Sequence, residues 1–286
     1  MKVYNSSKEL CYRSDGSTFI RDHLQKLQVK KLEKQSAYIN ETDTLKLTDI
    51  SNNYSTVFEF IEKTRTAFMS RRLLEKNSML STIFRFPPFK DMAKPSCDGL
   101  WMEFGVYRGD SISHIARWKT EYCGKKSEPV YGFDTFTGLP TNWRPGFDRG
   151  AFAIPKGKNV SVPSNVVLVS GLFIETLPTH LRIMDRKYQC KTTVSFIHVD
   201  CDIYDGARDI LFLLGSRFVT GTIILFDELF NYPGYEKHEI KALFEFLSGS
   251  SLRLKPLSTY YHIESKPAKD REGQSFAFVV DAPEGT

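Results

Sequence analysis

The sequence predicts an α/β protein whose core is one mostly parallel sheet. From about residue 98 of the 286-residue chain, short apolar segments alternate with segments of helical periodicity. Most of the apolar segments end in a glycine or an acidic residue, which is where a strand can turn into a helix. Strands that alternate with helices pair in parallel, and their helices cover both faces of the sheet.

The expected elements follow one another in a regular order. Strands are expected at residues 100–106, 129–134, 165–170, 194–200 and 222–227, which are apolar and rich in β-branched and aromatic residues. Helices are expected at 110–120, as a short helix after 173, at 205–216 and near 236–248. The segments 252–262 and 275–281 are expected to close the sheet as an antiparallel pair.

The first part of the chain has a different character. Residues 17–36 and 54–76 are expected to be helices, and in the second Val57 and Ile61 fall near one face. The prolines in 86–89 break any helix and mark a junction. We therefore expect an N-terminal helical extension over 1–95, acting as a lid or an oligomer surface, and an α/β domain over 96–286.

Composition excludes several classes of protein. The net charge is +5, but no large basic patch or known module points to nucleic acid. No apolar stretch reaches the ~18 residues that span a bilayer, and the start does not resemble a secretory signal. The five cysteines are scattered, odd in number and without a Cys-x-x-Cys pair. This pattern indicates reduced thiols in a cytoplasmic protein and no structural zinc.

A glycine turn follows the first expected strand. Glu103, Gly105 and Gly109 are spaced Glu-x-Gly-x-x-x-Gly, just before an expected helix. Glycine lets the backbone approach a ligand, and a helix N-terminus presents free N–H groups. The spacing lacks one glycine of the dinucleotide-binding fingerprint. The carboxylate of Glu103 would repel a pyrophosphate, whereas it suits a cationic ligand.

Acidic residues end the second, fourth and fifth expected strands. Asp134 follows Gly109 at a distance that suits a carboxylate binding a ribose diol, although capping or solvation is an equal alternative. Asp200 and Asp202 project to one side if their strand continues through both. Together with Asp227 and Glu228 they would repel one another unless protonated or bound to a divalent cation. In the simpler alternative, one aspartate caps the following helix and the others are solvated.

Three histidines lie near these elements. His198 precedes Asp200 by two residues and is expected either in the site or in the core. His262 is expected near the end of a late strand, where it could contact substrate. His238 is most simply a residue of a helix surface.

These motifs resemble the class I S-adenosylmethionine-dependent methyltransferases, and in particular the macrocin O-methyltransferase-like group. The resemblance covers roughly residues 98–248. It rests on the segments 103–111, 130–140, 170–178, 198–204 and 224–228, which occur in the order of the family. It implies a Rossmann-like sheet of seven strands, mostly parallel with the last strand antiparallel, in a domain that binds S-adenosylmethionine.

The resemblance also implies roles for individual residues. Binding of S-adenosylmethionine is expected from Glu103, Gly105, Tyr107, Arg108, Gly109, Ser111, Asp134, Thr135, Gly171 and Phe173. A metal ion, Mg²⁺, is expected on Asp200, Asp227 and Glu228, and catalysis is expected from Asp200 and Asp202. Glu228 departs from the Asp or Asn usual in the family, as does Asp205-Gly206 from the usual Ser/Thr. The aromatic segment 230–235 looks like a lip over the acceptor site.

The expected function is that of an O-methyltransferase. The methyl group would pass from S-adenosylmethionine to a hydroxyl of a small molecule, sugar-like or diol/catechol-like, with help from a divalent metal. The protein is expected to be free of membrane and nucleic acid, and a homo-oligomer is open. One alternative is a cofactor-binding but catalytically degenerate interaction protein. Another is a nicotinamide-dependent oxidoreductase, which would want the Gly-x-Gly-x-x-Gly loop that is missing here.

Overall fold

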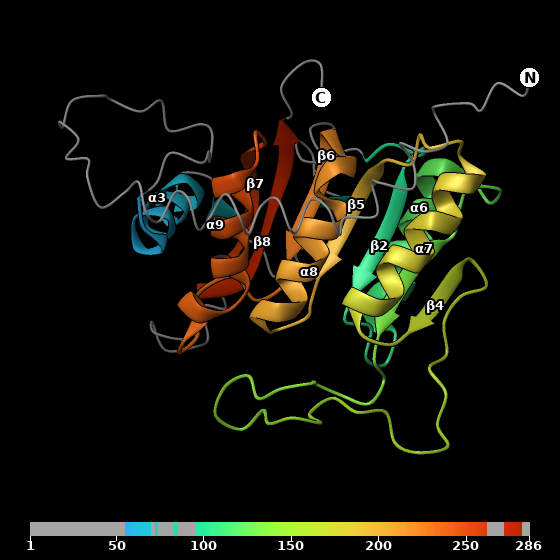
Figure 1. Ribbon diagram of the computed structural model, residues 1–286, viewed down its shortest axis with the longest axis horizontal. Helices are drawn as coiled ribbons and strands as arrows, with labels where there is room; N and C mark the ends of the chain where they lie inside the picture. The colour runs from blue at the N-terminus through green and yellow to red at the C-terminus, as the bar shows by residue number, and fades with distance from the viewer. Residues whose placement is uncertain (1–54, 70–71, 74–82, 85–94, 262–271, 282–286) are drawn as a thin grey trace, which may run out of the picture.

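The computed structural model describes residues 55–69, 72–73, 83–84, 95–261 and 272–281 (Figure 1). These residues contain one sheet with the strand order β1-β7-β8-β6-β5-β2-β3-β4. The strands are β1 Arg72–Leu73, β2 Leu100–Phe104, β3 Val130–Asp134, β4 Val166–Ser170, β5 Val194–Val199, β6 Phe218–Phe226, β7 Arg253–Tyr261 and β8 Glu272–Asp281.

The pairing confirms the predicted sheet. Strands β4, β3, β2, β5 and β6 are parallel to their neighbours, while β8 is antiparallel to both β6 and β7. The last strand of the chain, β8, therefore lies between β6 and β7 and runs antiparallel to both. The two-residue strand β1 extends the sheet beyond β7.

Helices cover the sheet on both faces. They are α3 Val57–Met69, α6 Asp110–Cys123, α7 Phe173–Lys187, α8 Tyr204–Leu214 and α9 Glu239–Gly249, with short 3-10 turns at Gly215–Arg217 and Tyr235–Lys237. Side chains alternate along a strand, so Met102 packs in a core with α7, α8 and α9, whereas Trp101 packs on the other face with α6.

Several expected boundaries were wrong. Helix α7 has 15 residues and is not short. The expected helix at 54–76 ends at Met69, and strand β1 begins at Arg72. The predicted helix at 17–36, the proline junction at 86–89 and His262 lie outside the described residues. Most of the N-terminal extension therefore stays a prediction.

A long connection joins β3 to β4. Residues 135–165 contain no helix or strand and pass beneath the carboxyl ends of the strands (Figure 1). The loop has internal order, because Leu139 and Ala151 are linked by a backbone hydrogen bond of 2.8 Å and Gly150 donates back to Leu139. Loops of this length without secondary structure are usually functional.

The cysteine prediction was wrong for part of the chain. Cys97 and Cys123 form a disulfide with a Cα–Cα distance of 5.5 Å, which joins the entry of β2 to the end of α6. Cys190 is also disulfide-bonded, whereas Cys201 is a buried free thiol. Scattered positions in the sequence hide such pairs, because the fold brings them together. The expectation of a cytoplasmic location therefore loses the support of the cysteines.

Another ground was the absence of an apolar span. Among the helices of the described residues, none is long and apolar enough to cross a membrane.

Candidate active site

The glycine turn after β2 is packed directly against the end of β5. Gly105 has φ +94°, and a Cβ on it would lie 1.7 Å from the carbonyl oxygen of Asp200. The Asp200 N–H in turn donates to the Phe104 carbonyl over 2.9 Å. Only glycine fits this approach, which therefore fixes where the two strand ends meet.

Asp134 at the end of β3 holds the glycine turn in place. Its Oδ2 accepts hydrogen bonds from the backbone N–H groups of Val106 and Tyr107, each over 2.8 Å. Its Oδ1 accepts from the N–H of Phe136 over 2.7 Å. The carboxylate thus links two loops, and a carboxylate with about four acceptor positions keeps capacity for a ligand.

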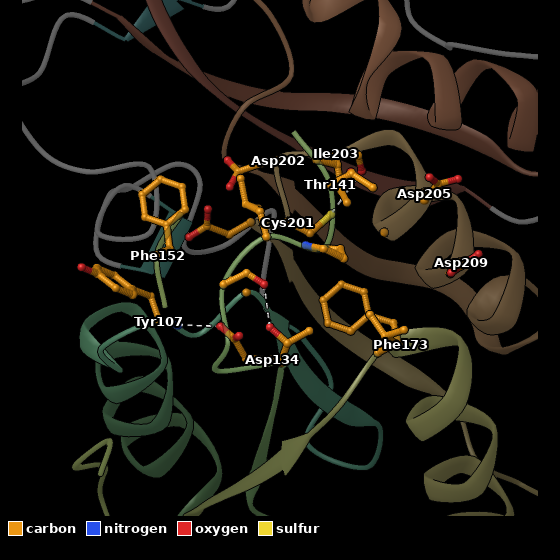
Figure 2. Close-up of a pocket in the computed structure, with 18 of the residues that line it drawn as sticks. Tyr107, Asp134, Thr141, Phe152, Phe173, Cys201, Asp202, Ile203, Asp205 and Asp209 are labelled. Atoms are coloured by element: carbon orange, nitrogen blue, oxygen red, sulfur yellow. Dashed lines mark hydrogen bonds between the residues drawn. The ribbon is translucent and has the colours of Figure 1, made fainter. Parts of the chain in front are cut away.

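A cavity of about 430 Å³ opens at these strand ends (Figure 2). In Figure 2, Tyr107 and Phe152 lie on one side of it and Phe173 lies on the other. Its walls come from the glycine turn, the 135–165 loop, the start of α7, the turn after β5 and the start of α8. The lining residues are Gly105, Tyr107, Asp134, Thr135, Gly138, Leu139, Pro140, Thr141, Phe152, Leu172, Phe173, Ile174, Asp200, Cys201, Asp202, Ile203, Asp205, Gly206, Asp209 and Glu228.

The cavity lining is rich in acidic residues. Six of its lining residues are acidic, and none of its lining residues is Lys, Arg or His. The acids are Asp134, Asp200, Asp202, Asp205, Asp209 and Glu228. Arg208 pairs with Asp205 and Asp209, so the other four acids are the ones that can attract a cation and repel a phosphate.

Three of these acids converge on one point. Oxygen atoms of Asp200, Asp202 and Glu228 all lie within 4.8 Å of one another. Burial, followed by the charges of Asp227 and Glu228, raises the pKa of Asp200 well above its usual range. Burial and the neighbouring carboxylates raise the pKa of Glu228 in the same way, and its buried Oε2 has no hydrogen-bond partner.

Asp202 is the member of this group that titrates near neutrality. Burial raises its pKa to about 7, although the charge of Arg144 opposes the shift. The residue has φ +67°, a left-handed conformation that side chains other than glycine rarely adopt. Such conformations are often found at functional sites.

A second acidic pair lies behind the cavity, around His198. His198 Nδ1 is 2.8 Å from Glu103 Oε1, and His198 Nε2 is 3.9 Å from Asp227 Oδ1, an ion-pair distance longer than a hydrogen bond. Ser275 donates a hydrogen bond of 2.8 Å to Asp227. Glu103 is fully buried and does not line the cavity. Its side chain instead contacts His198.

The structure brings together half of the cofactor residues expected from the sequence. Gly105, Tyr107, Asp134, Thr135 and Phe173 line the cavity, whereas Glu103, Arg108, Gly109, Ser111 and Gly171 do not. A Cβ on Gly109 would meet Val160 and Val162, so this glycine serves the packing of the 135–165 loop. Asp200, Asp202 and Glu228 line the cavity, but Asp227 faces His198 and Ser275 instead.

Sequence reasoning missed several residues of the site. Asp209 lies one helical turn after Asp205 at the start of α8. The sequence marked Asp205 only as a departure from the family pattern, and the i, i+4 spacing of the two acids was the available signal for Asp209. The sequence of the 135–165 loop has no periodic pattern, so its part in the cavity wall could not be predicted. Glu239, the first residue of α9, is fully buried beside the turn after β5. His238, expected on a helix surface, is half-buried and next to Tyr232.

The strand order, the lone antiparallel strand β8 and the acidic cavity at the glycine turn define a class I methyltransferase fold. Residues 102–229 match the family described as a methyltransferase domain. This match indicates a methyltransferase domain over these residues. No curated protein matches it.

Several solved structures show a likeness in fold. The calicheamicin methyltransferase CalS11 is 21% identical with a TM-score of 0.48, over 85% of this chain and 99% of that chain. The O-methyltransferase NovP is 16% identical with a TM-score of 0.46, over 70% of this chain and 78% of that chain. Aeropyrum pernix fibrillarin with bound S-adenosyl-L-methionine is 12% identical with a TM-score of 0.32, over 64% and 66%.

Proposed function

We propose that this protein is an O-methyltransferase that moves a methyl group to a hydroxyl of a small molecule, sugar-like or diol/catechol-like, with a divalent metal, Mg²⁺, at the acceptor side. The observation that carries the proposal is the cavity itself. It is bounded by the glycine turn, contains six carboxylates and has no basic lining residue.

The cavity suits the two ends of S-adenosylmethionine. Its ammonium and sulfonium groups are cationic, which fits an acidic wall, whereas the pyrophosphate of a nicotinamide dinucleotide would be repelled. Leu172, Phe173 and Ile174 give the cavity an apolar side for a planar base. We assign Asp134 to the ribose hydroxyls, in addition to its role in holding the glycine turn.

The residues at the other side suit a hard cation. Asp200, Asp202 and Glu228 offer oxygen ligands within 4.8 Å of one another, and the unpartnered Glu228 Oε2 is a ready ligand atom. The ligand set therefore replaces the predicted Asp227 with Asp202. A bound Mg²⁺ would lower the pKa of an acceptor hydroxyl and orient its oxygens.

The chain's own residues supply the proton chemistry. S-adenosylmethionine provides a methyl group that is already activated on sulfur. What remains is to hold the acceptor oxygen in line and to remove its proton. In the metal-free protein the pKa of Asp202 is raised to about 7, and we assign its oxygen that does not bind the metal to accept that proton. The pKa of Asp200 is raised well above its usual range because burial and neighbouring acids disfavour its negative charge. A bound cation would offset that charge, so we assign Asp200 to metal binding.

The competing function is a cofactor-binding interaction protein without activity. Degenerate members would be expected to lose acids after β5 and β6, yet Asp200, Asp202, Asp227 and Glu228 are all present. This retention favours the enzyme. The acceptor is a small molecule in this proposal, and the chain is expected to act without nucleic acid or membrane. A homo-oligomer and a cytoplasmic location stay predictions.

The cofactor assignment is tested by calorimetric titration of S-adenosylmethionine. We expect Asp134→Ala to lose at least about tenfold in affinity, since charge-assisted hydrogen bonds contribute roughly 1.5–3 kcal/mol. Asp148→Ala is the control, because Asp148 is an exposed acid of the 135–165 loop that follows Asp134 and does not line the cavity. Equal affinity for the wild type and the Asp134 variant would refute the assignment.

Turnover is tested with a radiolabelled methyl donor and a panel of sugars, polyols and catechols. Once an acceptor is found, we expect EDTA to abolish turnover and added Mg²⁺ to restore it. Full activity in EDTA would remove the metal from the proposal and leave the methyltransferase assignment intact.

A further inference from the structure

Glu239 connects α9 to the turn that presents the acids of the cavity. It is the first residue of α9 and is 0% exposed. Its Oε1 accepts hydrogen bonds from the N–H groups of Asp202, over 3.2 Å, and of Cys201, over 3.4 Å. One buried carboxylate oxygen thus binds two consecutive amides of another segment.

These two amides belong to the strained part of the turn. Asp202 has φ +67°, which requires the surrounding structure to hold it. The Cys201 Sγ also lies 3.6 Å from Glu239 Oε1. Without an acceptor at this point the two N–H groups would be left buried and unpaired, so the turn would relax toward an ordinary conformation.

Burying the Glu239 side chain at this contact is energetically unfavourable in itself. A fully buried carboxylate beside other acids is unfavourable unless it is well bonded. Glu239 Oε2 has no hydrogen-bond partner, so the hydrogen bonds that Glu239 accepts all converge on its other oxygen, at the turn after β5.

We propose that Glu239 is a positioning residue, which holds Asp202 in its left-handed conformation and thereby keeps the Asp202 carboxylate within reach of those of Asp200 and Glu228. The inference rests on the proposed function of that group as the metal and acceptor site. Glu239 lines no part of the cavity and acts through the backbone.

Three variants separate positioning from a general loss of structure. Glu239→Gln keeps an oxygen acceptor for the two amides and places its NH2 group where Oε2 has no partner. Glu239→Ala removes the acceptor. Glu236→Gln is the matched control, because Glu236 precedes α9 and is only half-buried.

The first measurement is amide hydrogen exchange at Cys201 and Asp202 in the full-length protein. We expect exchange in Glu239→Ala to be at least about tenfold faster than in the wild type, while Glu239→Gln and Glu236→Gln stay within about twofold. Unchanged protection in Glu239→Ala, or loss in Glu239→Gln equal to that in Glu239→Ala, would overturn the proposal. This readout depends on neither a metal nor an acceptor.

The second measurement is binding of Mn²⁺, followed by electron paramagnetic resonance, with S-adenosylhomocysteine binding as a check on the fold. Loss of a residue that orients metal ligands costs about 10- to 100-fold in metal affinity. We expect that loss in Glu239→Ala, recovery in Glu239→Gln, and S-adenosylhomocysteine affinity within about twofold in both. Equal Mn²⁺ affinity in Glu239→Ala and the wild type would refute the positioning role. If the wild type binds no Mn²⁺, the proposed metal fails, and amide exchange alone decides the role of Glu239.

Discussion

His198 and Glu103 are cross-strand partners in the centre of the sheet. They face each other in the register of β5 and β2, and His198 Nδ1 lies 2.8 Å from Glu103 Oε1 with both side chains buried. Burial opposes a charge on the imidazole, but Asp227 and Glu103 outweigh it and raise the pKa of His198 well above its usual range. A protonated histidine on β5 therefore lies between the buried Glu103 of β2 and the partly exposed Asp227 after β6.

Removing this cation should strongly destabilise the protein. We expect His198→Gln to lower the free energy of unfolding by about 3–5 kcal/mol, because a buried ion pair would lose one partner. Urea denaturation measures the change, with His114→Gln as control since His114 is exposed on α6. A loss below about 1 kcal/mol would show that the pair is unimportant.

The stability of the metal-free protein should fall as pH rises. A group whose pKa is raised by folding stabilises the protein below its unfolded pKa, and that contribution is lost as pH rises through the folded pKa. His198, Asp200, Glu228 and Glu239 all have raised pKa values, and the pKa of Asp202 is raised to about 7. We expect the melting temperature to decrease between pH 5 and pH 8, with the loss from Asp202 complete just above about pH 7. Stability that increases over this range would contradict the raised values.

Gly105 should tolerate no side chain. Alanine at positive φ costs about 1–2 kcal/mol, and at Gly105 it would also overlap the Asp200 carbonyl. We expect Gly105→Ala to lose S-adenosylmethionine binding and to be much less stable than Gly146→Ala. Gly146 has a similar φ of +89°, yet a Cβ there meets nothing within 4 Å. Equal effects of the two substitutions would mean that backbone strain alone is responsible.

The disulfide between Cys97 and Cys123 should contribute measurably to stability. Its partners are 26 residues apart, and closing such a loop contributes about 2–4 kcal/mol. We expect Cys97→Ala, Cys123→Ala and the double variant to lose similar amounts in urea denaturation, because each removes the same bond. Additive losses from the two single variants would show that no bond joins them.

The sheet could be predicted from the sequence because its signals are local. Each strand from β2 to β6 is a short apolar segment. The acidic residues that follow several of these strands predict a site at one edge of the sheet. The residues that the sequence misplaced depend on register and packing. Glu103 follows the pattern of a cofactor ligand, yet its side chain is turned toward His198. Glu239 and the cysteine pair gain their roles only when distant segments meet, which no periodicity encodes.

Arg144 should tune the pKa of Asp202. Its guanidinium lies 3.8 Å from the ring centre of Trp143 and 5.0 Å from those of Phe147 and Tyr232, which holds the 135–165 loop against the segment after β6. Its positive charge lowers the pKa of Asp202 against the effect of burial. Removing the charge should therefore raise that pKa further above about 7.

If Asp202 is the base, its protonation sets the acidic limb of the pH–rate profile. We expect Arg144→Gln to move this limb to higher pH and Arg144→Lys to leave it near the wild-type position, because lysine keeps the charge and can still lie over the aromatic rings. Asp202→Asn should lose the limb and about 10²- to 10⁴-fold in rate. A limb that stays in place in Arg144→Gln would show that another group titrates, since the charge of Arg144 acts on Asp202 in the folded protein.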